Sequence, residues 1–370
     1  MNLNPVNRSA VALALAAGLL AMSQAQAAAT ENNLQKTFSV SSGGKLVVDA
    51  DRGSIDVTPS GNDKVEIRVL RKVTRATAAK AEEVFADHEV TFEQDGNQVT
   101  VKAKGKRDTS GWRLWQPNLQ VRYEVIVPRQ FNLDLKTAGG SISVGDLTGD
   151  VRLQTAGGSL QTASITGQVW GRTAGGSITA SGATGTVDVQ TAGGSIHLGE
   201  VAGPVAAETA GGGITVQSAK ASVKAKTAGG NIRIDQAEGP VRAETSGGSI
   251  TIKTVRGALE ARTAGGDIQA DEVHGAIDAH TSAGSVTVGL AGPLGKDCRL
   301  ETSGGSITLT LPKDFAAEVD AKTSGGRVTT DVPVTTQGEV GRGTLQGKIG
   351  LGGHLLKLRT SAGSIHLKQR

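Results

Sequence analysis

Acidic residues and histidines, the side chains that can act as general acids and bases, gather in one stretch of the chain. The members of this cluster are Asp267, Asp271, Glu272, His274, Asp278 and His280. On a common face they could cleave a glycosidic bond in an acidic polysaccharide. Successive side chains of an extended chain point to opposite sides, however, so these six fall on different faces. We expect a solvated polar surface here, and we keep polysaccharide binding or cleavage as an alternative.

No other pattern indicates a catalytic or ligand-binding site. The glycine-rich turns lack the Gly-Lys-Thr sequence and the helix of a phosphate-binding loop. The histidines are scattered without the pairing that a metal site needs; they are His88, His197, His274, His280, His354 and His366. The sequence therefore predicts a protein that is not an enzyme, with no catalytic residue, no metal site and no cofactor.

A repeat of fixed length positions these residues. The motif Thr137-Ala138-Gly139-Gly140-Ser141-Ile142 returns with each start 18 residues after the last. A constant period of this size indicates a stack of repeated units. Its copies begin at Thr155, Thr173, Thr191, Thr209, Thr227, Thr245, Thr263 and Thr281, with looser copies at Thr302, Thr323 and Thr360.

Each repeat encodes two short strands. In the first unit Ile142 and Val144 alternate with serines, and Val151 and Leu153 alternate with polar residues. Glycine supplies the backbone freedom that the corners need. Equivalent aliphatic side chains should stack in columns about 4.8 Å apart, with the threonines pointing inward and their hydroxyls bonded to backbone.

These features predict an all-β fold, a parallel β-solenoid (β-helix) of about 18 residues per coil. The usual preference of parallel crossovers favours a right-handed coil. The residues before successive threonines alternate in charge, so opposite charges would be neighbours in adjacent coils and would support the same register. These residues are Glu208, Lys226, Glu244 and Arg262.

Residues 1–28 have the features of a secretory signal peptide. Arg8 gives a positive start, residues 10–22 form the apolar run, and Ala25-Gln26-Ala27 is a small-x-small cleavage site. We therefore expect export to the periplasm or the cell surface. The mature chain contains no second apolar stretch, so we expect no transmembrane segment in it.

The mature chain divides into two predicted regions. Residues 29–131 read as an irregular, β-rich N-terminal cap with one short helix at residues 77–85 and a hairpin around Asp95-Gly96-Asn97. Residues 132–370 form the solenoid and its C-terminal closure. Trp112 and Trp115 fall in a polar loop of the cap, where they could form a binding tip, although we expect them to fold back onto the protein.

Composition excludes some partners and crosslinks. The net charge is +4 with acidic and basic residues interspersed, so the chain shows no basic block of the kind that binds nucleic acid. Cys298 is the single cysteine, so no intramolecular disulfide can form. We expect a small buried hydrophobic residue there; pairing between two chains is the alternative.

Three features together resemble a known family. The strand at residues 123–128 runs into Leu133-Asp134-Leu135, Thr-x-Gly-Gly-x-Ile units follow in series, and a glycine-rich closure precedes Leu356-Lys357-Leu358-Arg359-Thr360. In these features residues 37–370 resemble the bacterial "putative adhesin" family of β-strand-repeat proteins, a domain of unknown function. The resemblance implies export and a β-solenoid, and it implies no catalytic residues.

We therefore favour a non-enzymatic, exported β-solenoid that acts as an adhesion or structural surface of the cell envelope. Its partner would be an envelope glycan or a protein surface, and the sequence does not identify which. Two alternatives remain at this point. One is a polysaccharide-binding or polysaccharide-cleaving β-helix, and the other is a scaffold in which the open ends of solenoids associate end to end.

Overall fold

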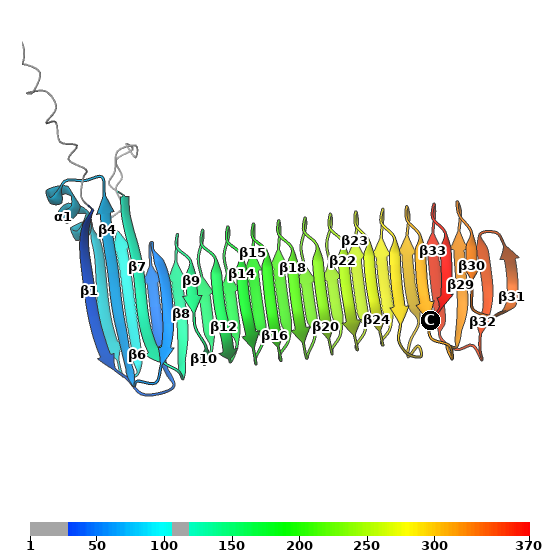
Figure 1. The fold of residues 1–370 in the computed structure, drawn as a ribbon, viewed down its shortest axis with the longest axis horizontal. Helices are drawn as coiled ribbons and strands as arrows, with labels where there is room; N and C mark the ends of the chain where they lie inside the picture. The colour runs from blue at the N-terminus through cyan, green and yellow to red at the C-terminus, as the bar shows by residue number, and fades with distance from the viewer. Residues whose placement is uncertain (1–28, 106–117) are drawn as a thin grey trace, which may run out of the picture.

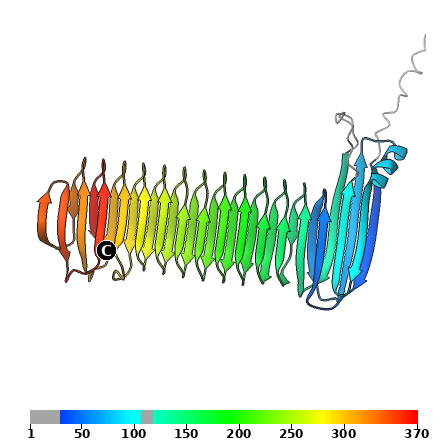
Figure 2. The same ribbon diagram turned by 180° about the vertical axis from the view of Figure 1, so that it is seen from behind.

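The protein is a long stack of β-strands with a cap at each end (Figure 1). The computed structural model describes residues 29–105 and 118–370. Each regular coil gives one strand to each of two parallel sheets, A and B (Figures 1 and 2). The buried aliphatic side chains of both sheets form one core between them. This arrangement confirms the predicted parallel β-solenoid; its handedness stays a prediction.

The regular coils extend from Phe131 to Thr302 in sheet B and from Ile142 to Leu311 in sheet A. Sheet A contains β9 (Ile142–Val144), β12 (Leu160–Thr166), β14 (Ile178–Ala183), β16 (Ile196–Val201), β18 (Ile214–Ala219), β20 (Ile232–Ala237), β22 (Ile250–Val255), β24 (Ile268–Val273), β26 (Val286–Leu290) and β28 (Ile307–Leu311), with β10 (Leu147–Thr148) beside β12. Sheet B contains β8 (Phe131–Thr137), β11 (Val151–Gln154), β13 (Val169–Arg172), β15 (Val187–Thr191), β17 (Val205–Thr209), β19 (Val223–Lys226), β21 (Val241–Glu244), β23 (Leu259–Thr263), β25 (Ile277–Thr281) and β27 (Cys298–Thr302).

Equivalent aliphatic residues of successive coils form continuous buried columns, as the repeat predicts. Ile178 pairs in register with Ile196 in sheet A, and Val187 pairs with Val205 in sheet B. All four side chains are at most 3% exposed. Cys298 continues the sheet B column at 2% exposure, which confirms the expected small buried residue.

The threonine that opens each repeat points inward and fastens one coil to the next. Thr263 is 5% exposed, and its hydroxyl donates a hydrogen bond of 2.8 Å to the carbonyl oxygen of Gly248 in the preceding coil. The Thr263 hydroxyl oxygen in turn accepts a hydrogen bond from the backbone N–H of Gly266 at 3.3 Å. The predicted inward threonines with backbone-bonded hydroxyls are therefore confirmed.

The two glycines of each motif differ in whether their surroundings leave room for a side chain. A Cβ atom on Gly248 would lie 2.0 Å from the carbonyl oxygen of Gly230 in the coil below, a distance that no side chain tolerates. A Cβ atom on Gly247 would meet its nearest atom at 3.4 Å, which is an ordinary contact. The second glycine therefore sets how closely the coils approach, whereas the first does not.

The N-terminal cap is built mainly from longer, partly antiparallel strands. The predicted helix is α1 (Ala78–Asp87), capped by the Thr77 hydroxyl, which accepts from the N–H of Lys80. The predicted hairpin is formed by β5 (His88–Asp95) and β6 (Gln98–Gly105). The elements of this cap are β1 (Thr30–Ser39), β2 (Gly44–Ala50), β3 (Ser54–Ser60), β4 (Lys64–Thr74), α1 (Ala78–Asp87), β5 (His88–Asp95), β6 (Gln98–Gly105) and β7 (Asn118–Pro128).

Spatial order departs from sequence order in the cap. Strand β2 lies between β6 and β8, and β3 lies between β7 and β9, in parallel pairings on both sides. The first coil of the sequence is therefore inserted between segments that come much later. Ile55 of β3 stands in register with Ile142, so this stretch is a member of the aliphatic column.

At the C-terminal end, too, a coil is inserted between segments that are not its neighbours in the sequence. Its strands are β29 (Ala317–Thr323), β30 (Val328–Thr330), β31 (Val334–Gly341), β32 (Thr344–Ile349), β33 (Leu355–Thr360) and β34 (Ile365–Gln369). Strand β33 lies between β27 and β29, and β34 lies between β28 and β30. In Figure 1 the red strand β33 accordingly stands inside the stack, with the orange strands beyond it.

Some expectations concern residues outside the described ranges. The expected signal peptide at residues 1–28 and the pair Trp112 and Trp115 lie there, so they stay predictions, as do the domain boundaries. Among the described residues, no helix is long and apolar enough to cross a membrane.

Candidate functional site

The outward face of sheet B carries two columns of polar side chains that run along the solenoid. In the first column Lys224, Arg242, Glu260, Asp278 and Arg299 follow one another in register. The second column contains the four residues whose alternating charge the sequence analysis singled out. Their pairing is as predicted, with Glu208 opposite Lys226, Lys226 opposite Glu244, and Glu244 opposite Arg262.

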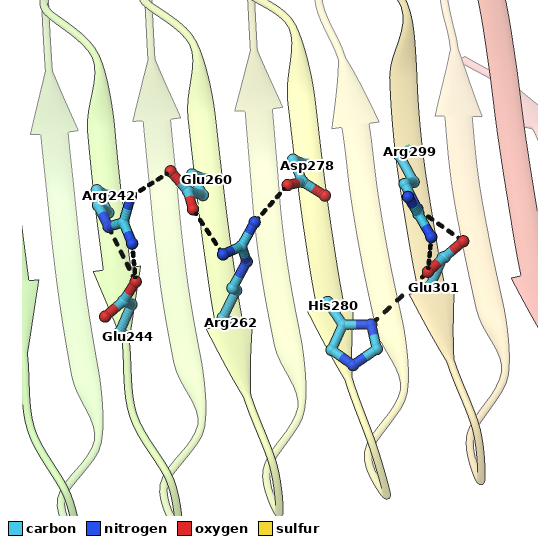
Figure 3. Close-up of polar contacts among 8 residues, drawn as sticks. All are labelled: Arg242, Glu244, Glu260, Arg262, Asp278, His280, Arg299 and Glu301. Carbon is cyan, nitrogen blue, oxygen red and sulfur yellow. Dashed lines mark hydrogen bonds and ion pairs between the residues drawn. The ribbon is translucent and has the colours of Figure 1, made fainter.

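Ion pairs join the two columns into two neighbouring groups, one from Glu244 to Asp278 and one around Glu301, which we together call the charge ladder (Figure 3). Arg242 binds Glu244 through Nε at 2.9 Å and Glu260 through Nη1 at 3.1 Å. Arg262 continues the network, with Nη1 3.1 Å from Glu260 Oε1 and Nη2 2.8 Å from Asp278 Oδ2. The ladder consists of Arg242, Glu244, Glu260, Arg262, Asp278, His280, Arg299 and Glu301.

Mutual contacts hold the ladder side chains in fixed positions. The hydrogen bond to Asp278, with the nearby carboxylates of Glu260 and Glu244, raises the pKa of Arg262 above its ordinary value. At the far end Arg299 lies 2.7 Å from Glu301, and His280 Nδ1 lies 3.9 Å from the same carboxylate. The result is an array of paired charges of both signs, in which neighbouring coils are separated by the strand spacing of about 4.8 Å.

A shallow groove of about 460 Å³ runs beside the ladder. Its floor follows the corner where sheet B strands begin, at Ser222, Pro240, Ala258 and Ala276. Lys224, Arg242, Glu260 and Asp278 form one rim, and Asp297 lies at one end. The groove therefore combines a floor of small side chains with a basic half and an acidic half, a lining suited to an extended polar ligand.

Trp170, which was not predicted to be a functional residue, lies on the same face nearer the N-terminal cap. The guanidinium carbon of Arg152 lies 3.7 Å from the Trp170 ring centroid, and that of Arg172 lies 4.7 Å away. Arg172 is held by Asp188 at 2.9 Å. The available signal was a tryptophan at an outward position of a strand in a sequence with 2% aromatic residues.

The six residues considered for acid–base chemistry are spread around their coil. Asp267 lies at the glycine-rich turn, where its Oδ1 accepts from the N–H of Ser285 at 2.7 Å. Asp271 and Glu272 belong to β24 in sheet A, and Glu272 lies 3.7 Å from His274.

Only Asp278 and His280 of this group belong to sheet B, where both are part of the charge ladder. The coil therefore does not present the six side chains to one bound substrate.

A separate polar cluster is buried in the N-terminal cap. His88 is 2% exposed, with Nε2 3.4 Å from Asp51 Oδ1, and Tyr123 is fully buried. Within the part of the chain that the structure describes, both His88 nitrogens, Asp51 Oδ1 and the Tyr123 hydroxyl lack a hydrogen-bond partner. Burial lowers the pKa of His88 and raises that of Tyr123. His88 and Tyr123 are closed off from solvent while Asp51 is partly exposed, so this cluster bears on the stability of the cap.

Arg71 fixes the elements around this cluster. Its Nη1 donates to the carbonyl oxygens of Phe85 at 3.1 Å and His88 at 3.0 Å, where α1 ends and β5 begins. Its Nε and Nη2 bind Asn32 of β1. Because burial is the main influence, the pKa of Arg71 is lowered.

Among residues 29–105 and 118–370, no three or more His, Cys, Asp or Glu side chains lie together in a way that could hold a metal ion.

Two stacked parallel sheets with a periodic outward face define the protein as a structural β-solenoid. The chain belongs to the family described as Toastrack DUF4097, whose sequence profile matches residues 43–297 and 257–368. This membership confirms the resemblance to an adhesin-like family of unknown function. No curated protein matches the chain.

Several solved structures are similar over most of their length. A "putative cell adhesion protein" from Clostridium sporogenes is 9% identical, with a TM-score of 0.19, covering 92% of this chain and 100% of that one. A "putative adhesin" from Bacteroides fragilis is 12% identical, with a TM-score of 0.26, covering 92% and 97%. A "putative lipid binding protein" from Parabacteroides distasonis is 13% identical, with a TM-score of 0.23, covering 91% and 96%. Superpositions this loose say nothing about what this chain binds.

Proposed function

We propose that the protein is an exported, non-enzymatic β-solenoid that presents the outward face of sheet B as an adhesion surface of the cell envelope. The observation that carries this proposal is the charge ladder, in which guanidinium and carboxylate groups are fixed to one another along successive coils. A surface whose side chains are already ordered loses less conformational entropy when a partner binds.

The chemistry of the face favours an extended, polar partner such as a glycan. Carboxylate and guanidinium groups bind sugar hydroxyls, and the groove beside the ladder has a length of several coils. Trp170 adds an aromatic ring between two arginines on the same face. The scatter of Asp267, Asp271 and Glu272 away from this face supports binding without cleavage.

A glycan array combined with a reducing-sugar assay tests the proposal. The wild-type protein should bind one class of glycan and release no sugar from it. The triple variant Arg242→Ala/Glu260→Ala/Arg262→Ala should lose binding at least tenfold. The matched control Gln269→Ala/Thr287→Ala removes outward side chains of sheet A, and it should bind like the wild type. Release of reducing sugar from any polymer would contradict the non-enzymatic assignment.

Export has its own test. Expression in a bacterial host, followed by cell fractionation and mass spectrometry of the purified protein, should give a mature chain that begins after the small-x-small site at Ala25-Gln26-Ala27. Recovery of the uncleaved chain from the cytosol would contradict export. It would not bear on the proposed binding surface, which the glycan array tests separately.

A further inference from the structure

The last coil of the sequence occupies a slot that other parts of the chain create. Strands β33 and β34 separate β27 and β28 on one side from β29 and β30 on the other, and every one of these contacts is a parallel pairing. If residues 355–370 left, two pairs of strand edges would lose their partners. The slot can therefore be filled only by a segment that fits both of its walls.

The contacts in the slot are apolar in the middle and polar at the rim. Leu356, Leu358, Ile365 and Leu367 are fully buried between the neighbouring coils. The Thr360 hydroxyl donates to the carbonyl oxygen of Gly305 at 2.7 Å. These contacts are specific to this segment, because they continue the columns of the solenoid in register.

Rim contacts add to this specificity on both sides of the coil. The N–H of Leu355 donates to Asp297 Oδ1 at 2.9 Å, and the guanidinium of Arg359 binds Asp320 on the opposite wall.

The connection to this coil is a short glycine-rich loop. Residues 350–354 lead from β32, which lies on one side of β29, to β33, which lies on the other side. Gly350, Gly352 and Gly353 have positive φ angles, and the side chain of Leu351 is 99% exposed. The loop is therefore held by few side-chain contacts, and glycine lets it take a different path at little conformational cost.

We propose that this coil is exchangeable between copies, so that residues 355–370 of one chain fill the slot of a second chain and give a swapped dimer. The swapped coil makes the same contacts as in the monomer, and only the path of residues 350–354 changes. Exchange of an identical element is a low-cost route to a dimer. The proposal is independent of what the outward face of sheet B binds, and it differs from association of intact solenoid ends.

The exchange can be read out with two outward cysteines. Arg299 and Lys357 are neighbours in register on β27 and β33, at a spacing of about 4.8 Å that a disulfide can bridge. In the background Cys298→Ala, the double variant Arg299→Cys/Lys357→Cys should crosslink on oxidation with diamide. Failure of this double variant to form any disulfide would overturn the placement of β33 beside β27.

Two single variants distinguish exchange from chance collision. A Cys298→Ala/Arg299→Cys chain is denatured and refolded together with a Cys298→Ala/Lys357→Cys chain that carries a different tag. The control mixture replaces Lys357→Cys by Leu351→Cys, which places the thiol on the exposed loop outside the slot. After oxidation, the Arg299–Lys357 mixture should contain at least ten times more disulfide-linked heterodimer than the control, and the amount should rise with protein concentration. Equal amounts in the two mixtures would overturn the proposal.

Discussion

The hydroxyl of Thr360 donates a hydrogen bond of 2.7 Å to the carbonyl oxygen of Gly305, which lies 55 residues earlier in the chain. In the regular coils the same bond spans 15 residues, as between Thr263 and Gly248. Thr323, which precedes Thr360 in the sequence, bonds instead to the carbonyl oxygen of Gly363 in the last coil. The coil that contains Thr360 is therefore enclosed between two earlier coils of the sequence, and its side chains belong to the core.

Truncation of two leucines seven positions apart should change the free energy of unfolding by very different amounts. Leu358 is fully buried in the inserted coil, and Leu351 is 99% exposed in the loop before it. Leu358→Ala should lower the free energy of unfolding by about 2–5 kcal/mol, since it leaves a cavity between coils. Leu351→Ala should change it by less than about 0.5 kcal/mol. Urea denaturation followed by circular dichroism measures both; similar losses in the two variants would place Leu358 outside the core.

Substitution of the adjacent glycines Gly247 and Gly248 by alanine should also have unequal effects on stability. Gly248→Ala puts a Cβ atom 2.0 Å from the carbonyl oxygen of Gly230, so the coils must separate locally. We expect a loss of about 1–3 kcal/mol or more, the range of an overpacked core. Gly247→Ala, whose Cβ atom meets ordinary contacts, should be tolerated. Thermal unfolding of the two variants decides between these expectations, and equal melting temperatures would contradict the assigned spacing of the coils.

The threonine column should contribute through hydrogen bonds. Thr263→Val keeps the shape of the side chain but removes the donor to Gly248 and the acceptor for the N–H of Gly266. The expected cost is about 1–3 kcal/mol, because buried backbone groups lose their partners. Thr287→Val, on the outward side of β26, should be nearly neutral. If chemical denaturation finds the two valine variants equally stable, the inward hydroxyls do not hold the coils together.

Acid should destabilise the N-terminal cap. Burial lowers the pKa of His88 below its ordinary value of 6.5, with Asp51 opposing this shift and Arg71 and Arg52 adding to it; Tyr123 lies in the same cluster. The unfolded chain therefore binds a proton at a higher pH than the folded chain does. Stability should be level above about pH 6.5 and should fall as the pH drops from there toward the folded pKa.

A matched pair of variants assigns this acid dependence. His88→Gln removes the buried titrating group and should flatten the loss of stability below about pH 6.5. His197→Gln removes an exposed imidazole on β16 and should leave the wild-type profile unchanged. Unfolding midpoints measured across this range report the difference. A profile for His88→Gln that matches the wild type would assign the acid sensitivity to other groups.

The ladder should matter more for binding than for stability. Arg262 is half exposed, and its ion pairs with Glu260 and Asp278 are screened by solvent. Arg262→Ala should therefore lower the free energy of unfolding by less than about 1 kcal/mol. The measurement is denaturant unfolding at low and high salt, and a loss of several kcal/mol would show that the ladder is a structural element first.

The regular part of the fold could be predicted because one coil has a constant length. Eighteen residues separate Ile178 from Ile196, so a strand spacing places them side by side and the same step places every threonine. The parity of alternation also predicted which side chains point inward. The period of the sequence thus determined the columns, the corners and the sheet B pairing of Glu244 with Arg262.

The order of the end coils could not be predicted in this way. Thr323 precedes Thr360 in the sequence but lies beyond it in the stack, because the loop at residues 350–354 passes back around β29. A repeat motif reports that a segment is a coil and carries no information about which coils it lies between. The contacts of Trp170 could not be predicted either, because the repeat constrains the residue type only at inward positions and Trp170 points outward.

Native-state hydrogen exchange tests most directly the claim that residues 355–369 lie within the stack. The backbone amides of β33 and β34 should be protected as strongly as those of β27 and β28, while amides of the loop at residues 350–354 exchange rapidly. Rapid exchange throughout residues 355–369, with protection kept in β27 and β29, would contradict this placement of the last coil.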